Sequence, residues 1–123
     1  MVGFTLDGPR AVFKPTGPAS AERAASLLAE AMGECRRAGA AALLADLRGL
    51  THTPLTSADL FTFGHELALS SDRTIKLALL VRQDQIDPEA FAQKVARNRG
   101  LFFERFTDES AAAEWLHLQG GSR

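Results

Sequence analysis

The sequence has very little cysteine: Cys35 is the single one among 123 residues. One cysteine cannot form a disulfide within the chain, so the composition gives no indication of an oxidising compartment. The position of Cys35 on the apolar stripe of a predicted helix favours a small core residue over a nucleophile. Long hydrophobic runs are missing too, since no apolar stretch approaches the roughly 20 residues of a membrane-spanning helix. The N-terminal segment lacks the basic start and apolar stretch of a signal peptide, so we expect a cytoplasmic protein.

A strong charge of either sign is also missing. Fourteen Lys and Arg residues against fifteen Asp and Glu residues leave a formal net charge of −1. This balance provides no field for steering the protein to nucleic acid or to an anionic membrane. Hydrophobic residues make up 46% and charged residues 24%, which is ordinary for a globular protein of one domain. We therefore expect a single domain over residues 1–119 and a flexible tail over 120–123.

The usual signatures of catalysis and metal binding are absent from the sequence. His52, His65 and His117 are too dispersed for a metal site, and no cysteine cluster assists them. No G-x-S-x-G nucleophile turn and no glycine-rich phosphate loop occurs. The loop position of His52, near Asp46 and Arg48, suggests a general base, but we favour an exposed or hydrogen-bonded loop residue. We therefore predict no catalytic residues, no metal, no cofactor and no enzymatic activity.

The sequence does contain a regular alternation of strand and helix patterns. Turn chemistry in an Asp-Gly-Pro segment joins two short alternating runs into a hairpin over 3–17. Two later runs are apolar on both faces, as strands buried between helix layers are. Helix periodicity and capping residues mark the segments between the strands. The expected elements after the hairpin are a helix over 20–39, a strand over 41–47, a helix over 56–71, a strand over 74–82, a helix over 87–100, a strand over 101–108 and a helix over 108–118.

This order of elements predicts an α/β fold. Strands that are joined by helices favour parallel neighbours with right-handed crossovers, and the hairpin adds an antiparallel edge. We expect one mixed, mostly parallel sheet of about five strands, with an N-terminal antiparallel hairpin and about four helices. The central prediction is that residues 40–47 and 74–81 lie side by side and run in the same direction.

Several residues carry expectations about the helices. Ser20 is a suitable N-cap for the first helix, and Gly39 is a suitable stop. Gly33 costs about 1 kcal/mol relative to Ala inside that helix, which indicates a close approach to the sheet. The expectations for the helix over 87–100 are Asp87 as its cap, Pro88 in its first turn, and Phe91 and Val95 packed inward.

Four stretches of the sequence resemble a known family. They are LLADLRGL (43–50), IKLALLV (75–81), NRG (98–100) and FTDESAAAEWL (106–116). In these stretches and in its element order, almost the whole chain resembles the small SpoIIAA-like proteins of the STAS-like fold, which is named for sulphate transporters and anti-sigma-factor antagonists. The resemblance implies a mixed sheet with helices packed over it, and a bacterial regulatory or ligand-binding protein without catalysis.

One departure from the family pattern concerns regulation. Phospho-regulated relatives carry Asp-Ser-Ser-Gly after the third strand, and the second serine is their phosphorylation switch. The matching residues here are Asp46, Leu47, Arg48 and Gly49, with Arg48 at the position of the switch serine. A guanidinium cannot form a phosphate ester, so the resemblance implies a module without the usual phosphorylatable serine. The nearby hydroxyls that would have to replace it, which we do not expect to be phosphorylated, are Thr51, Thr53, Thr56 and Ser57.

The same segment is a candidate site for a ligand or an anion. Open α/β sheets bind ligands at the carboxyl ends of parallel strands, where Asp46 and Arg82 are expected. Arg48 could bind a carboxylate or phosphate, and a helix starting near Ser57 could add backbone N–H donors. The alternative is structural: Asp46 caps the loop, Arg48 pairs with Asp46 or a helix carboxylate, and Gly49 allows the turn. The candidate anion site comprises Asp46, Arg48, Gly49, Thr51, His52, Ser57 and Arg82.

Basic and aromatic residues suggest a contact surface in the second half of the chain. The segment ARNRG (96–100) places positive charge at a helix end, which favours capping, while the alternative is contact with an acidic partner. Phe61 and Phe63 cannot both face the core from one helix, so one of them is expected near the surface. Large rings among small alanines could also leave a groove between helices and sheet. The candidate interaction surface comprises Phe61, His65, Arg97 and Arg99.

Two functions follow from these observations. The first is a regulatory, protein-interaction module that forms a homodimer through a sheet edge or the second helix and binds an unknown protein partner. The second is a carrier or sensor that binds a small apolar or anionic ligand at the helix–sheet groove, as lipid-binding relatives of related topology do. Neither function requires a nucleic acid, a membrane span or a cofactor.

Overall fold

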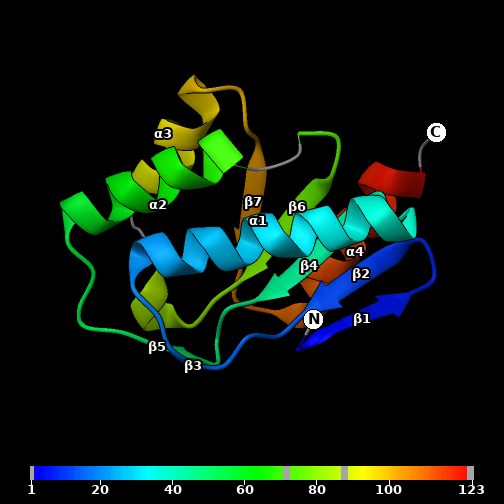
Figure 1. Ribbon diagram of the computed structural model, residues 1–123, viewed down its shortest axis with the longest axis horizontal. Coiled ribbons are helices and arrows are strands. Elements are labelled where there is room, and N and C mark those ends of the chain that lie inside the picture. Colours follow the sequence, from blue (N-terminus) through cyan, green and yellow to red (C-terminus); the bar gives the residue numbers. More distant parts are fainter. Residues whose placement is uncertain (1, 71–72, 87–88, 122–123) are drawn as a thin grey trace.

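The computed structural model describes residues 2–70, 73–86 and 89–121, and its centre is a mixed sheet (Figure 1). The five strands lie in the order β1-β2-β4-β6-β7. Strands β1 and β2 are antiparallel, and every other neighbouring pair is parallel, which confirms the predicted fold class. The strands are β1 (Phe4–Asp7), β2 (Arg10–Phe13), β4 (Ala42–Asp46), β6 (Lys76–Leu80) and β7 (Phe103–Phe106).

The middle of the sheet is formed by β4 and β6, as the two-sided apolar runs predict. The two strands are parallel, and their register pairs Ala42 with Lys76 and Asp46 with Leu80. All five residues of β4 are buried, because helices cover both faces of the sheet at this point. The central prediction of the sequence is therefore confirmed. Because the two strands are parallel, their carboxyl ends lie next to each other.

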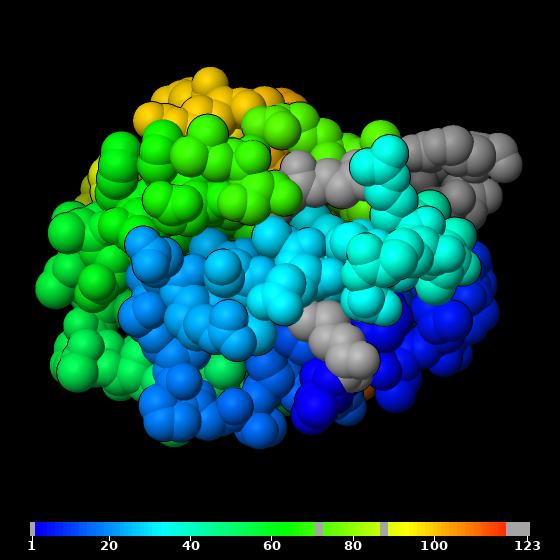
Figure 2. All heavy atoms as spheres, in the orientation of Figure 1, coloured from blue at the N-terminus to red at the C-terminus, as the bar shows by residue number. Residues whose placement is uncertain are grey.

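Four helices cover the two faces unequally. Helices α1 (Ala21–Ala38), α2 (Ser57–Ser70) and α3 (Phe91–Asn98) lie on one face, and α4 (Glu109–Gly121) lies on the other (Figure 1). Side chains of α1 and α2 cover most of the face that the space-filling view presents (Figure 2). Alternate residues of the strands join two separate cores, a large one under α1 and α2 and a small one under α4. Among the described residues, no helix is long and apolar enough to cross a membrane.

The first helix is capped as its sequence predicts. The hydroxyl of Ser20 accepts a hydrogen bond from the backbone N–H of Arg23 at 3.1 Å. Gly39 ends the helix with a φ of 77°, a left-handed conformation that favours glycine. Cys35 is fully buried in the core, and this burial raises the pKa of its thiol to about 11. The thiol is therefore protonated at neutral pH, which suits a core residue and not a nucleophile.

The predicted role of Gly33 in a close approach to the sheet is wrong, and the close approach that requires a glycine lies between two helices, at Gly64. A Cβ atom added to Gly33 would meet only the guanidinium of Arg37, at 3.7 Å. A Cβ atom added to Gly64 would lie 2.4 Å from the backbone oxygen of Ala92. Helices α2 and α3 thus pack backbone against backbone at Gly64, whereas α1 does not need Gly33 to approach the sheet.

Helix α3 differs from its prediction at its N-terminal end. It begins at Phe91, after Ala90 with a φ of 53°, and the predicted caps Asp87 and Pro88 lie outside the described residues. Val95 is buried as expected, but Phe91 is 37% exposed and not packed inward. The physical reason is the orientation of the helix, whose inward face is formed by Ala92, Val95 and Ala96.

Three short elements were not predicted. Strands β3 (Gly17–Pro18) and β5 (Leu50–Thr51) form a separate parallel pair, and a 3₁₀-helix, η1, spans Gln83–Gln85. Hydrogen bonds from Gly17 N to Gly49 O (3.1 Å) and from Ala19 N to Thr51 O (3.0 Å) extend the β3–β5 pair at both ends. Helix α4 continues to Gly121, and the proposed single domain over 1–119 with a tail over 120–123 stays a prediction.

Candidate functional site

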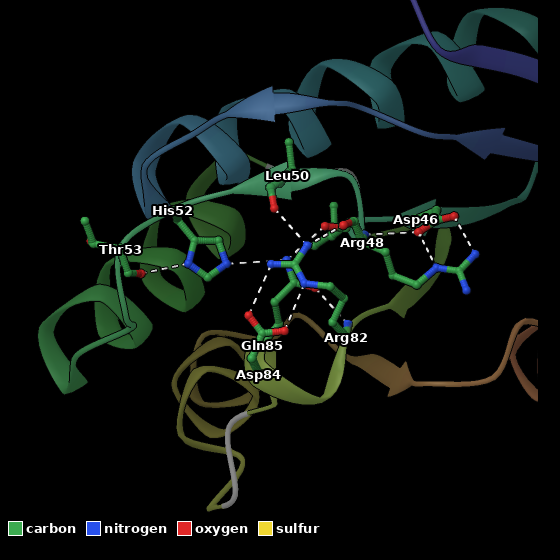
Figure 3. Close-up of polar contacts among 9 residues, drawn as sticks. Asp46, Arg48, Leu50, His52, Thr53, Arg82, Asp84 and Gln85 are labelled. Atoms are coloured by element: carbon green, nitrogen blue, oxygen red, sulfur yellow. Dashed lines mark hydrogen bonds and ion pairs between the residues drawn. The ribbon is translucent and has the colours of Figure 1, made fainter.

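The predicted anion site lies at the carboxyl end of β4, where Asp46 and Arg48 contact each other. The Nε and Nη2 atoms of Arg48 donate to the two carboxylate oxygens of Asp46 at 3.0 and 2.9 Å (Figure 3). The backbone N–H of Arg48 donates to the same carboxylate at 3.1 Å. Glu109, at the start of α4, lies 3.5 Å from Nη2 of Arg48. The Asp46 carboxylate therefore caps the turn and holds the guanidinium with both of its oxygens.

The electrostatics of this pair follow from its burial. Burial of Asp46 opposes its ionisation, but the hydrogen bonds from the Arg48 side chain and backbone outweigh burial and lower the pKa of the carboxyl. The same hydrogen bonds raise the pKa of Arg48, so both groups are charged at neutral pH. Because two carboxylates already contact Arg48, its positive charge is largely compensated. The anion site stays a prediction. The contacts seen here are those of the structural alternative, in which Asp46 caps the loop and pairs with Arg48.

Arg82 follows β6 and ties its end to the neighbouring loop. Its Nη1 donates to the carbonyl oxygen of Leu50 at 2.9 Å and to that of Arg48, and its Nε donates to Asp84 at 2.9 Å. The second predicted arginine thus binds backbone carbonyls of the segment that follows β4. Gly49 serves the same turn, since an added Cβ would lie 3.0 Å from the backbone oxygen of Pro15.

Gln85 links this network to His52. Its Nε2 donates to Leu47 O at 2.9 Å, and its Oε1 accepts from Arg82 N at 2.8 Å. The Nδ1 of His52 lies 2.8 Å from the carbonyl oxygen of Thr53, which can only accept, so Nδ1 carries the proton. His52 Nε2 is therefore the acceptor that faces Gln85 Nε2 at 3.4 Å. This geometry matches the interpretation that we favour from the sequence, in which His52 is a hydrogen-bonded loop residue (Figure 3).

The side chains of the remaining predicted residues take no part in the hydrogen bonds described for this corner. Thr51 is exposed in β5, and Ser57 is exposed as the first residue of α2. Thr56, and not Ser57, caps α2: its hydroxyl accepts from Asp59 N at 3.1 Å, and the Asp59 carboxylate accepts from Thr56 N at 2.9 Å. The structure thus brings together Asp46, Arg48, Gly49, His52 and Arg82, which we call the strand-end corner.

Beside the strand-end corner lies a cavity of about 100 Å³ that sequence reasoning did not locate. Leu79 and Phe103, from β6 and β7, line it from the sheet. Ala24 of α1 and Leu60 and Phe63 of α2 line it from the helices. The signal in the sequence was the mixture of large rings with small alanines, which predicted a groove between helices and sheet without placing it. We call this space the α2 cavity.

Polar groups occur at only a few points around the α2 cavity. They include His52 from the strand-end corner, Gln85 of η1, Asp59 from the first turn of α2, Gln93 from α3 and Arg105 from β7. Gln93 Nε2 donates to Phe103 O at 2.8 Å and to Glu104 Oε1 at 3.1 Å, so its donors are used within the protein. A mostly apolar space with a few polar groups is typical of a pocket for a small organic ligand. Among the described residues, no group of His, Cys, Asp or Glu could hold a metal ion.

A second set of predicted residues gathers at the end of α3. Phe61 is 43% exposed and stacks on His65, with ring centroids 5.5 Å apart. The guanidinium of Arg99 lies 5.5 Å from the Phe61 ring, and that of Arg97 lies 5.7 Å from the ring of Phe102. One of the two phenylalanines of α2 was expected near the surface. That expectation is confirmed, because Phe61 is exposed while Phe63 packs on the core.

Comparison with solved structures decides the fold family. A protein from Shewanella loihica PV-4, described as an uncharacterized member of the DUF3478 family with a SpoIIAA-like fold, superposes on this chain with a TM-score of 0.52. The match covers 93% of this chain and 90% of the other, at 22% sequence identity. This chain has a SpoIIAA-like fold. Comparison with protein-family models gives no match, and comparison with curated proteins gives none either.

The SpoIIAA-like fold confirms what the resemblance implies about architecture. It also gives the departure at Arg48 a structural meaning, since the corresponding turn here is held by an ion pair. The fold does not by itself specify a ligand or a partner, because one fold supports many functions.

Proposed function

We propose that this chain is a non-enzymatic binding module whose main site is the α2 cavity, which takes a small apolar ligand. The observation that carries this proposal is the cavity itself, an apolar space beside the carboxyl ends of β4 and β6. Well-packed proteins contain few voids larger than a water molecule, so a space of this size favours a site that a ligand fills. The strand ends are also where open α/β sheets commonly bind ligands.

The size of the α2 cavity indicates the size of its ligand. Its volume is about 100 Å³. An engineered apolar cavity of about 150 Å³ in another protein stays dry and binds benzene, so a ligand near the size of one small ring suits this one. His52 and Asp59 lie where such a ligand could place one polar group. A short-chain or single-ring compound with one hydrogen-bonding end is the class that we propose.

A non-enzymatic role is supported by the reactive side chains that are bonded within the protein or buried. The carboxylate of Asp46 and the guanidinium of Arg48 are bonded to each other, and Arg82 is bonded to backbone carbonyls. Cys35 is buried, with its thiol pKa raised. None of these groups faces a substrate in the way that general acid–base or nucleophilic catalysis requires.

We also propose a protein-interaction role, in which the module acts through its surface without a phosphorylation switch. The outer faces of α2 and α3 support this role, because Phe61 and Phe102 are exposed there. A homodimer through α2 or the edge strand β1 belongs to the same proposal. Light scattering over a wide concentration range tests the dimer, and a monomer throughout would rule it out.

Ligand binding is best tested with small apolar probes and a matched pair of variants. Native mass spectrometry of freshly purified protein comes first, to detect a co-purifying compound. NMR titration with benzene, phenol and butyrate then follows the methyl signals of Leu60 and Leu79. Ala24→Leu fills the α2 cavity from α1, while Ala38→Leu adds the same side chain at an exposed position of the same helix.

We expect wild type and Ala38→Leu to bind at least one probe and Ala24→Leu to bind none, with both variants folded by circular dichroism. Equal binding by the two variants, or no shift with any probe together with no co-purifying compound, would exclude the α2 cavity as the site.

A further inference from the structure

Two arginine–phenylalanine pairs, four exposed side chains in all, lie around the C-terminal end of α3. They are Phe61, Arg99, Arg97 and Phe102, and we call them the Arg–Phe patch. Arg99 lies over the Phe61 ring and Arg97 over the Phe102 ring, at 5.5 and 5.7 Å. Two of the six exposed large apolar side chains of the described residues are here, with Phe61 43% and Phe102 65% exposed.

The positive charge of this surface is not compensated within the described residues. No carboxylate of those residues lies within ion-pair distance of Lys94, Arg97 or Arg99. Arg99 donates to Val95 O at 3.2 Å and so caps α3, which accounts for one of the two arginines. Arg97 contacts the Phe102 ring and donates to no described group. Capping therefore explains Arg99 but leaves the charge of Arg97 unexplained.

The backbone under the patch is held firmly. Arg73 donates to Ala68 O at 2.8 Å and to Arg99 O at 2.7 Å, which joins the end of α2 to the end of α3. The close packing at Gly64 fixes the same two helices one turn further along. A partner would thus meet a surface whose side chains are already positioned, which lowers the cost of binding.

We propose that the Arg–Phe patch binds an acidic peptide segment that carries at least one aromatic or aliphatic side chain. This inference rests on the protein-interaction part of the proposed function and names the chemistry of the partner. Arginine and aromatic residues are the types that most often dominate protein interfaces. Uncompensated arginines select carboxylates, while the exposed rings offer an apolar contact between them.

A peptide fits the patch better than a nucleic acid or a membrane does. The formal net charge of the whole chain is −1, and the patch contains two arginines, fewer than the basic residues of an interface that follows a phosphate backbone. Anionic membranes attract clusters of basic residues larger than this one. A second copy of the chain would place like charges against each other if it used the same patch about a two-fold axis.

The probes for the test are short synthetic peptides rich in Asp and Glu with one Phe or Leu. One matched set replaces the acids by Asn and Gln, and another replaces the apolar residue by Ala. Binding is measured by fluorescence anisotropy at two salt concentrations. The variants are Arg97→Gln with Arg99→Gln, and Phe102→Ala. Their controls are Arg36→Gln with Arg37→Gln at the exposed end of α1, and Leu6→Ala, an exposed apolar residue of β1.

We expect acidic peptides with an apolar residue to bind wild type and both controls alike. The double arginine variant should bind about tenfold more weakly, and Phe102→Ala several-fold more weakly. Added salt should weaken wild-type binding. Both matched peptide sets should also bind more weakly than their parents.

Several results would overturn the proposal: no acidic peptide binds wild type, the control variants lose as much affinity as the patch variants, or the Ala-substituted peptides bind as well as their parents. Single-stranded poly(U) or phosphatidylserine vesicles binding with the same dependence on the patch would identify another class of partner and reject this one. Ala24→Leu separates the two proposed sites, because it should lose the small probes and keep the peptide.

Discussion

The strand-end corner and the α2 cavity lie side by side but differ in nearly every physical respect. The corner is rich in charge, and its groups are bonded to one another: Asp46 to Arg48, and Arg82 to backbone carbonyls. The cavity is poor in charge and contains unfilled space between Leu60, Leu79 and Phe103. The charged groups that stand out in the sequence are thus bonded to one another, whereas the space that we propose for a ligand is lined by residues with no distinctive chemistry.

The largest effect on stability is expected where α2 packs against the backbone of Ala92, a residue that lines the α2 cavity. Gly64→Ala places a methyl group 2.4 Å from the backbone oxygen of Ala92, so α2 and α3 must separate. We expect a loss of about 2–3 kcal/mol in the free energy of unfolding, measured by urea denaturation. The matched Gly33→Ala change meets only the Arg37 guanidinium and should increase stability by about 0.5–1 kcal/mol. Equal effects of the two substitutions would contradict the α2–α3 packing.

The next effect tests the corner as a structural element. Asp46→Asn removes the charge that the guanidinium and the backbone N–H of Arg48 contact. We expect a loss of about 1–3 kcal/mol at neutral pH, because Asp46 is nearly buried. Asp7→Asn, which breaks an exposed pair with Arg10, should cost less than about 1 kcal/mol.

The pH dependence of the same variant has a definite sign. The pKa of Asp46 is lower in the folded protein than in the unfolded chain, so its contribution to stability is present at neutral pH. That contribution is lost as the pH falls below about 4 and the folded carboxyl becomes protonated. The difference in stability between wild type and Asp46→Asn should therefore narrow in acid. A difference that stays constant down to pH values well below the usual Asp pKa would contradict the ion pair.

A smaller effect is expected where the corner and the cavity meet. Gln85→Ala leaves Arg82 N without its partner and removes one of the two donors to Leu47 O, so it should cost about 1–2 kcal/mol. Because Gln85 also faces the α2 cavity, probe binding should change as well. NMR titration with phenol checks this, with Asp46→Asn as the comparison that should bind normally. If Asp46→Asn changed probe binding as strongly as Gln85→Ala, the two regions would not be distinct.

The smallest effect concerns anions. Two carboxylates contact Arg48, so phosphate and sulphate should find little uncompensated charge there. We expect any anion-induced change in melting temperature to be the same in wild type and in Arg48→Ala. A shift with phosphate that disappears in Arg48→Ala would instead establish the predicted anion site at the corner.

The fold could be predicted from the sequence because local signals agreed with one another. Ser20 and Gly39 cap α1 as expected, and the two-sided apolar runs ending near Asp46 and Leu80 form the central parallel pair. Where residues carried competing meanings, the prediction was weaker. Gly33 and Gly64 look alike in a helix pattern, and only the packing of α2 on α3 shows which one is required.

The candidate sites could be predicted only in part, for a related reason. The partners of Arg48, Arg82 and His52 lie mostly in the neighbouring loop, and the sequence placed them near one another. The α2 cavity depends on volumes left between Ala24, Phe63 and Phe103, which are far apart in the sequence. No local pattern encodes an empty space, so its position appears only when the helices are packed on the sheet.

The short strands β3 and β5 have a consequence for selectivity. Strand β3 leads into Ser20 and α1, and β5 leads into His52, so their ladder joins two sides of the α2 cavity. The hydrogen bonds from Gly17 N to Gly49 O and from Ala19 N to Thr51 O extend this ladder at both ends. Because this ladder ties two sides of the cavity together, we expect the opening of the α2 cavity to keep a constant width and to select ligands by their cross-section. Straight and branched isomers of the same mass should then differ in affinity. Affinity should fall sharply above a limiting ligand width and not decline gradually.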